Sequence, residues 1–144
     1  MQVSTTRFGL IEVADEEVIL FPEGLYGFEK QKRYVVIDQE EAGPFRMLQS
    51  LDEPALTFVV VDPVAIYADF KIEPSTEDLA LIDATKGADL AQMAIVTLGR
   101  RLEEATLNLG APLIVNRISH KGVQAVLNDT DYTTKEPLIP DPEA

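Results

Sequence analysis

Cysteine and tryptophan are absent from the 144 residues, and histidine occurs only once, as His120. The lack of cysteine excludes disulfides, thiolate metal ligands and cysteine nucleophiles, and it fits a reducing compartment. His120 lies beside Lys121 in a predicted turn, where a solvated histidine is far more common than a catalytic base, and one histidine cannot supply the usual zinc ligands. Gly24 and Gly27 lack the directly following lysine of a phosphate-binding loop. We therefore predict no catalytic residues, no metal site and no cofactor.

Basic residues are scarce: 12 lysines and arginines face 25 acids, which gives a formal net charge of −13. Phosphate backbones and anionic membrane surfaces repel such a chain, so we expect no direct nucleic-acid partner and no membrane partner. Acidity alone can serve solubility. The alternative interpretation is that the negative field steers a basic protein partner or shields that partner from RNA.

Long apolar runs are also missing. Apolar runs such as Phe58–Val61 and its neighbours fall far short of the ~20 residues that cross a bilayer. Met1–Thr5 shows no basic region followed by an apolar one, so we expect no signal peptide. These features predict a cytoplasmic protein.

The acids are unevenly placed, with none between Glu104 and Asp129. Adjacent acids recur beside turn and helix-start signals, where they usually form a solvated face. These pairs are Glu16-Glu17, Glu40-Glu41, Asp52-Glu53, Glu77-Asp78 and Glu103-Glu104. A hydrolase that uses two carboxylates stays open as an alternative. Such a pair would lie in a concave pocket, and one of its acids would have a raised pKa.

Strand signals dominate what the chain does contain, because β-branched and aromatic runs alternate with turn formers. The expected strands are Phe8–Val13, Val18–Phe21, Tyr34–Ile37, Phe45–Ser50, Leu56–Val61, Ala94–Leu98, Ala105–Leu109, Leu113–Ile118 and Val123–Leu127. The last two flank a turn with Gly122, which suits a hairpin. Many short strands with little helix between them predict a mainly β chain, a compact antiparallel β-barrel-like single domain.

One short helical insertion is expected around residues 75–92. Ser75 has the features of an N-cap with Asp78 three residues later, and the helix should end before Gly87. A further short turn over Ala88–Gln92 is possible. We expect the β domain to span residues 1–136, followed by an extended proline-rich tail over 137–144.

The most distinctive block is Phe21–Glu29, which reads F-P-E-G-L-Y-G-F-E. A strand end and a proline stop are followed by two glycines that let the backbone turn tightly, while Leu25 and Phe28 fold back onto a core. The residues alone favour a rigid corner.

This block resembles the F-P-x-G-L-x-G-F-E motif of the flagellar assembly factor family FliW. Two further blocks follow in the family's order, so the resemblance covers nearly the whole chain. They are Leu48–Pro54 with Phe58–Pro63, and Ala105–Asn116 with Lys121–Leu127 and Asp131-Tyr132. Gly110 stands where the family pattern leads us to expect a longer, often polar residue.

The resemblance implies a compact barrel-like β fold with a small helical insertion, and a role in partner switching. FliW-like proteins bind flagellin and, alternatively, the RNA-binding translational repressor CsrA. Flagellin occupies the factor while it is abundant in the cytoplasm. After flagellin has been exported, the freed factor binds CsrA and relieves repression of the flagellin message.

Candidate contact residues are the members of the family-like blocks and their neighbours that we expect to be exposed, since glycine, proline and apolar members usually serve packing. They are Glu23, Tyr26, Gln49, Asn116 and Lys121. We expect the protein to be a monomer on its own and not an enzyme. A structural interaction subunit without a regulatory role is the remaining alternative.

Overall fold

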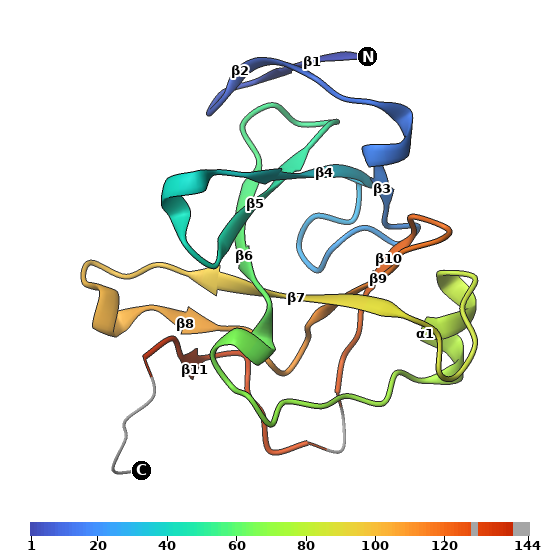
Figure 1. Cartoon of the computed structure of the whole chain (residues 1–144), viewed down its shortest axis with the longest axis vertical. Helices are drawn as coiled ribbons and strands as arrows, with labels where there is room; N and C mark the ends of the chain where they lie inside the picture. The colour runs from blue at the N-terminus through green and yellow to red at the C-terminus, as the bar shows by residue number, and fades with distance from the viewer. Residues whose placement is uncertain (128–129, 140–144) are drawn as a thin grey trace.

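The computed structural model describes residues 1–127 and 130–139, whose backbone forms two antiparallel sheets (Figure 1). An N-terminal hairpin pairs β1 (Gln2–Thr5) with β2 (Gly9–Glu12). The other sheet has nine strands in the order β10-β9-β7-β6-β5-β4-β3, and β8 pairs with both β7 and β11. These strands are β3 (Ile19–Leu20), β4 (Arg33–Asp38), β5 (Phe45–Ser50), β6 (Thr57–Val61), β7 (Leu90–Thr97), β8 (Thr106–Leu107), β9 (Leu113–Asn116), β10 (Gly122–Gln124) and β11 (Glu136–Pro137). The predicted mainly β single domain is confirmed.

The strand expected at Phe45–Ser50 matches β5 in both bounds, because the turn formers on either side mark its ends locally. β7 is different. It begins at Leu90, so the turn considered over Ala88–Gln92 is wrong. Leu90–Met93 is held as a strand by its antiparallel pairing with β9, a partner remote in sequence.

The two ends of the strand path meet at one point. A single parallel bridge joins Leu20 to Lys121, where the Leu20 N–H donates to the His120 carbonyl at 2.9 Å. Elsewhere along these ends the described residues form no ladder, so the sheet curves like a barrel without being closed by a strand pair.

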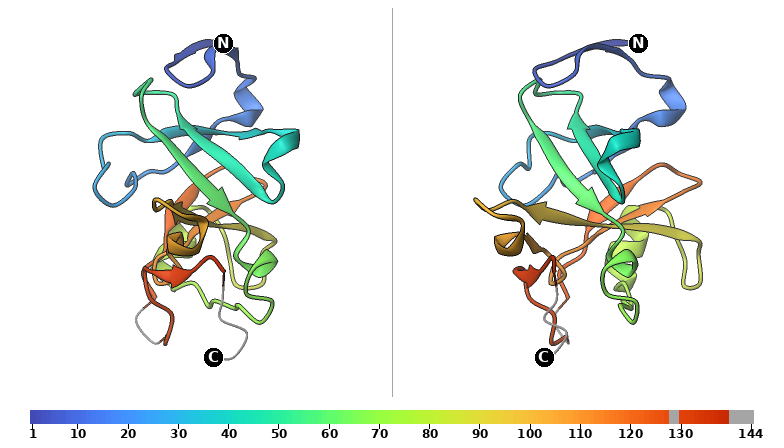
Figure 2. Two further views of the ribbon diagram at one scale, coloured as in Figure 1. Left: turned by 90° about the vertical axis from the view of Figure 1, so that its left-hand side faces the viewer. Right: turned by 60° about the vertical axis from the view of Figure 1, so that its left-hand side comes forward.

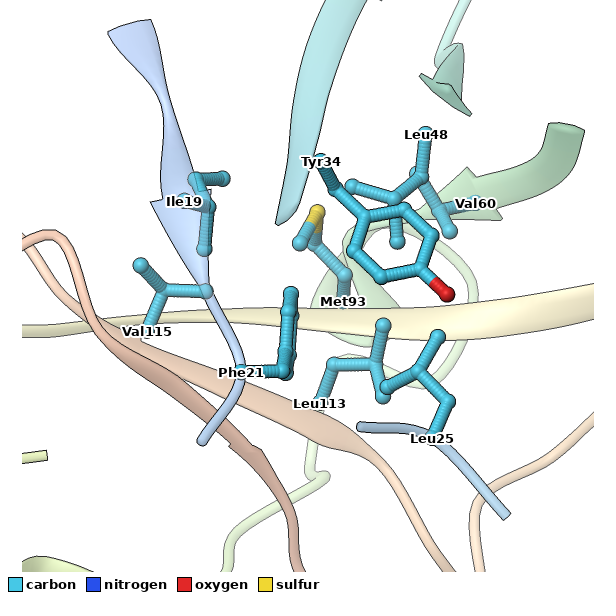
Figure 3. Packing of buried hydrophobic residues seen from close by; sticks show 9 residues of the cluster. All are labelled: Ile19, Phe21, Leu25, Tyr34, Leu48, Val60, Met93, Leu113 and Val115. Carbon is cyan, nitrogen blue, oxygen red and sulfur yellow. The ribbon is translucent and has the colours of Figure 1, made fainter. Parts of the chain in front are cut away.

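The largest part of the core lies inside this curved sheet. Its fully or nearly fully buried side chains come from β3 to β7, β9 and the loop after β3, and they converge in Figure 3. They are Ile19, Phe21, Leu25, Tyr34, Leu48, Val60, Met93, Leu113 and Val115. The Phe21 and Tyr34 rings meet edge to face with centroids 5.5 Å apart, a favourable geometry for an aromatic pair.

The helical insertion is a single short α-helix, α1 (Thr76–Leu81), capped as predicted. The Ser75 Oγ accepts a hydrogen bond from the Asp78 N–H at 3.0 Å. Four 3₁₀ turns complete the regular structure of the described residues: Asp15–Glu17, Glu40–Ala42, Pro63–Ala65 and Leu102–Glu104. None of the described helices is both long and apolar enough to cross a membrane.

The described C-terminal segment, residues 130–139, is joined to the domain. Glu136 and Pro137 form β11 against β8, and Leu138 is buried beside Val61 and Leu107. The expected boundary at residue 137 stays a prediction, since residues 140–144 lie outside the described residues. Figure 2 shows the N-terminal hairpin and the β11 segment toward opposite ends of the long axis.

Candidate protein-binding site

The loop over Phe21–Glu29 is a corner whose apolar members anchor it to the core. Phe21 is fully buried and Leu25 nearly so. Gly24 has φ of +67°, and a Cβ at this position would lie 2.6 Å from the Glu29 Cα. Only glycine combines this left-handed backbone with so close an approach. The corner therefore has one shape, and that shape turns Glu23 and Tyr26 outward.

The same loop is tied to the β9–β10 hairpin. The Tyr26 N–H donates to the Gln124 Oε1 at 2.8 Å. A Cβ at Gly122 would lie 2.5 Å from the Phe21 ring, so β10 needs glycine there. Two segments about a hundred residues apart in sequence are thus held together beside the Leu20–Lys121 bridge.

Three of the five predicted contact residues lie on these two segments. Glu23 is exposed and Tyr26 is 63% exposed. Lys121 is partly exposed, and its Nζ lies 2.8 Å from the Asp83 Oδ2 at the end of α1. No hydrogen bond or ion pair in the described part of the chain links Lys121 to Glu23 or Tyr26. We call these three residues, Glu23, Tyr26 and Lys121, the loop–hairpin surface.

The expectation that Gln49 and Asn116 are exposed is wrong. Gln49 is fully buried, and its amide donates to the Ser50 and Pro54 carbonyls and accepts from the Thr57 hydroxyl. Asn116 is 6% exposed and donates to the Ile82 carbonyl at 2.9 Å. The Gln49 amide satisfies carbonyls at the end of β5 and in the turn after it, and the Asn116 amide satisfies a carbonyl in the turn after α1, which is why a polar side chain is needed inside.

A hollow of about 470 Å³ opens at one end of the core, on the face of the sheet that carries the cluster of Figure 3. Its floor is apolar and consists of Ile19, Val36, Val60, Ala91, Met93 and Val115. Acids at its rim are Glu16, Glu17, Asp38 and Asp62. We call this feature the acid-rimmed hollow.

Comparison with known proteins identifies the chain's relatives. The family model described as FliW protein matches residues 2–138. The chain is 41% identical to the flagellar assembly factor FliW of Natranaerobius thermophilus over 142 residues, which covers 98% of this chain and 94% of that protein. The chain belongs to the FliW family. It is also 35% identical to the FliW of Bacillus subtilis over 138 residues, 96% of each protein.

The same relationship holds in three dimensions. A crystal structure of the flagellar assembly factor FliW superposes with a TM-score of 0.88 at 32% identity, covering 97% of this chain and 98% of the other. The resemblance carried by the Phe21–Glu29 block and its companions is therefore confirmed, and with it the membership in a family of flagellar assembly factors.

The displaced pKa of Asp52 does not support the hydrolase alternative. Burial by itself raises the pKa of Asp52, but hydrogen bonds from the Arg33 guanidinium and from the N–H groups of Arg33 and Lys32 outweigh it and leave the pKa below its usual value. A general acid needs the opposite shift. Within residues 1–127 and 130–139, no three His, Asp or Glu side chains are grouped to hold a metal ion.

Sequence reasoning missed the acid-rimmed hollow. Glu16 and Glu17 look like a solvated turn in the sequence, and they do form the 3₁₀ turn before β3. Their position over the apolar floor depends on how β3, β6, β7 and β9 come together. The available local signal was the repeated placement of an acid directly beside a buried strand, as at Asp38 and Asp62.

Proposed function

We propose that this chain is a cytoplasmic flagellar assembly factor that binds a CsrA-type RNA-binding regulator and, alternatively, flagellin. Membership of the FliW family over residues 2–138 carries the proposal. Bound flagellin keeps the factor occupied. When flagellin leaves the cell, the free factor binds the regulator and relieves repression of the flagellin message. The factor acts by binding and not as an enzyme.

The loop–hairpin surface is the proposed contact region. Tyr26 offers a large exposed ring on a corner that cannot bend, because Gly24 and the Gln124 hydrogen bond hold it. A preorganised aromatic side chain loses little entropy on binding and is a frequent interface anchor.

The test of this surface is Tyr26→Ala against Leu10→Ala. Both side chains are more than half exposed, at 63% and 65%, but Leu10 lies on the N-terminal hairpin. Truncating Tyr26 is expected to weaken binding of the purified regulator or of flagellin by about 1–2 kcal/mol, as measured by calorimetry. Equal affinities for the two variants would remove Tyr26 from the site.

The acidity supports the antagonism itself. A carrier of net charge −13 docked beside an RNA-binding surface opposes RNA phosphates over about 8–10 Å at physiological salt. It can do so without covering the RNA site. This role needs exposed acids that are free to act at a distance.

Asp69, Glu77 and Glu103 are exposed acids outside the loop–hairpin surface and the acid-rimmed hollow. The variant D69N/E77Q/E103Q is expected to bind the regulator as well as the parent chain and to displace its RNA less effectively. Fluorescence anisotropy of labelled RNA measures displacement, and calorimetry measures binding. If the variant displaces RNA as effectively as the parent chain, the electrostatic part of the proposal is wrong.

The regulatory role itself is tested by competition between the two partners. Purified regulator and flagellin are each titrated against the full chain, and then flagellin is added to the preformed regulator complex. Mutually exclusive binding supports the partner switch. If neither protein binds, the regulatory role is contradicted and the alternative of a structural interaction subunit is favoured.

A further inference from the structure

The acid-rimmed hollow combines an apolar floor with a rim of acidic side chains. Solubility in water does not require these two surfaces to lie together. Its floor is a continuation of the core, since Ile19, Val60, Met93 and Val115 belong to the cluster of Figure 3. Val36 and Ala91 are only partly buried, so apolar surface remains open to a ligand. Apolar surface of this kind favours an apolar side chain that fills it.

Acidic side chains outnumber arginines at the rim of the hollow. Two arginines reach the hollow, but each carries its own carboxylate: Arg46 Nε lies 2.6 Å from Asp38 Oδ1, and Arg117 Nε lies 3.4 Å from Asp89 Oδ1. His120 is the other basic side chain at the rim.

Three rim acids have no basic partner within the described residues. They are Glu16, Glu17 and Asp62. One carboxylate oxygen each of Glu17 and Asp62 accepts a backbone hydrogen bond, from Ala14 and Val64, at 2.9 and 3.1 Å. Glu17 and Asp62 are therefore held in place, and all three acids remain available to cationic groups.

The hollow also contains a free strand edge. β6 pairs with β7 only at Ala94–Val96, while β9 pairs with Leu90–Met93 along the opposite edge. β6 ends at Val61, and Pro63 two residues later cannot donate a backbone hydrogen bond to continue the pairing. The edge of Leu90–Met93 that faces away from β9 is left unpaired by the described strands, and Ala91 and Met93 line the hollow. Such an edge accepts an extended segment through backbone hydrogen bonds.

We infer that the acid-rimmed hollow is the docking site for an extended basic segment of a protein partner. Apolar side chains of that segment contact the floor, its lysines or arginines lie against Glu16, Glu17 and Asp62, and its backbone pairs with the free edge of β7. The inference deepens the proposed function by giving the partner's chemistry, and it rests on that function only in taking a protein as the ligand.

Three synthetic octapeptides serve as probes: alternating Lys-Val, alternating Glu-Val and alternating Lys-Ser. Backbone amide shifts of the ¹⁵N-labelled full chain are followed by NMR. The Lys-Val peptide is expected to shift the amides of Val36 and Ala91–Met93, the Glu-Val peptide to leave them unchanged, and the Lys-Ser peptide to bind more weakly. Shifts elsewhere, equal shifts with Glu-Val, or equal binding of Lys-Ser would overturn the inference.

The variant E16Q/E17Q/D62N removes the rim charge while each amide keeps an acceptor oxygen for the backbone bonds. It is expected to bind the Lys-Val peptide about tenfold more weakly. The matched control D69N/E77Q/E103Q changes the net charge equally and should bind within about twofold of the parent chain, because contacts at the rim outweigh the screened general field. Equal losses in both variants would overturn the assignment of the rim acids.

Substitution of a floor residue by a larger one tests the docking site independently of charge. Ala91→Phe places a ring in the hollow, whereas Ala55→Phe places one on the exposed turn between β5 and β6. Loss of peptide binding in A91F alone, with thermal unfolding still cooperative, supports the site. Intact binding in a folded A91F contradicts it.

The two proposals fail separately. If regulator and flagellin do not bind the parent chain while the Lys-Val peptide occupies the hollow, the proposed function fails and the docking site stands. If both proteins bind but neither is displaced by the peptide nor weakened in E16Q/E17Q/D62N, the proposed function stands and the docking inference is overturned.

Discussion

At the scale of single residues, Tyr34 carries a hydroxyl into the apolar interior. The side chain is fully buried in the cluster of Figure 3, and its oxygen has no hydrogen-bond partner in the described structure. Burial, with a smaller contribution from Asp52, raises the pKa of Tyr34 to about 12. The unpaired hydroxyl costs free energy in the folded state.

Tyr34→Phe is therefore expected to leave the free energy of unfolding at pH 7 unchanged or to raise it by up to about 1 kcal/mol. The unfolded tyrosine titrates near pH 10, so the parent chain should lose about 2 kcal/mol relative to the variant as the pH rises from 10 to 12. Urea unfolding at both ends of that range measures the difference. A parallel pH dependence in both proteins would contradict the buried-hydroxyl account.

The two glycines of the Phe21–Glu29 corner differ in the space that a Cβ atom would have. Gly24 and Gly27 both have positive φ, at +67° and +86°. A Cβ at Gly24 would also meet the Glu29 backbone, whereas nothing lies within 4 Å of one at Gly27.

Gly27→Ala is expected to cost about 1–2 kcal/mol, the cost of a left-handed backbone for alanine. Gly24→Ala should cost about 1–3 kcal/mol more because the backbone must move as well. Urea denaturation compares the pair directly. Equal costs would show that the corner relaxes around residue 24.

At the scale of elements, the C-terminal segment shows where local signals stop being sufficient. Pro137 and its neighbours indicate an extended tail, and they are extended. Yet β8 recruits Glu136 and Pro137 as β11, and the Leu138 N–H donates to the Ala105 carbonyl at 2.9 Å. Proline is tolerated at such an edge. No pattern within residues 135–144 identifies β8 as the partner.

Leu138 and Ile139 provide a matched pair for this contact. Leu138 is 5% exposed and Ile139 is 49% exposed. Leu138→Ala is expected to lower the free energy of unfolding by about 2–4 kcal/mol, and Ile139→Ala by less than about 1 kcal/mol. Thermal and urea unfolding test both. A small loss at Leu138 would mean that β11 contributes little to the domain.

An element of the sheet was predictable from the sequence where neighbouring residues alone mark its bounds. The bounds of β5 follow from the turn formers beside it, and the Ser75 cap follows from capping chemistry that neighbouring residues supply. The N-terminal half of β7 and the burial of Gln49 follow from strands and turns that meet only in the folded chain.

At the scale of the whole molecule, the charge of −13 is distributed over some faces and not others. The acid-free stretch from Ala105 to Asn128 supplies β8, β9 and β10. Any repulsive or steering field must arise from the other elements, including the rim acids Glu16, Glu17 and Asp62. Long-range attraction of this kind acts mainly on the association rate.

The association rate of the basic regulator is therefore expected to fall by about tenfold between about 0.05 M and 0.3 M salt, with a smaller change in the dissociation rate. Stopped-flow mixing measures both rates. The variant D69N/E77Q/E103Q should show a shallower salt dependence. A rate independent of salt in the parent chain would exclude electrostatic steering.

The sequence by itself determined the absence of thiol chemistry, the negative charge, the succession of short strands, the Ser75-capped helix and the family blocks. Each depends on composition or on neighbours within a few residues. Tertiary structure alone decided that Gln49 and Asn116 are internal, that Leu138 is core, and that Glu16 and Asp62 share one rim. These outcomes need pairings between segments far apart in the chain, and no local pattern specifies which segments will meet.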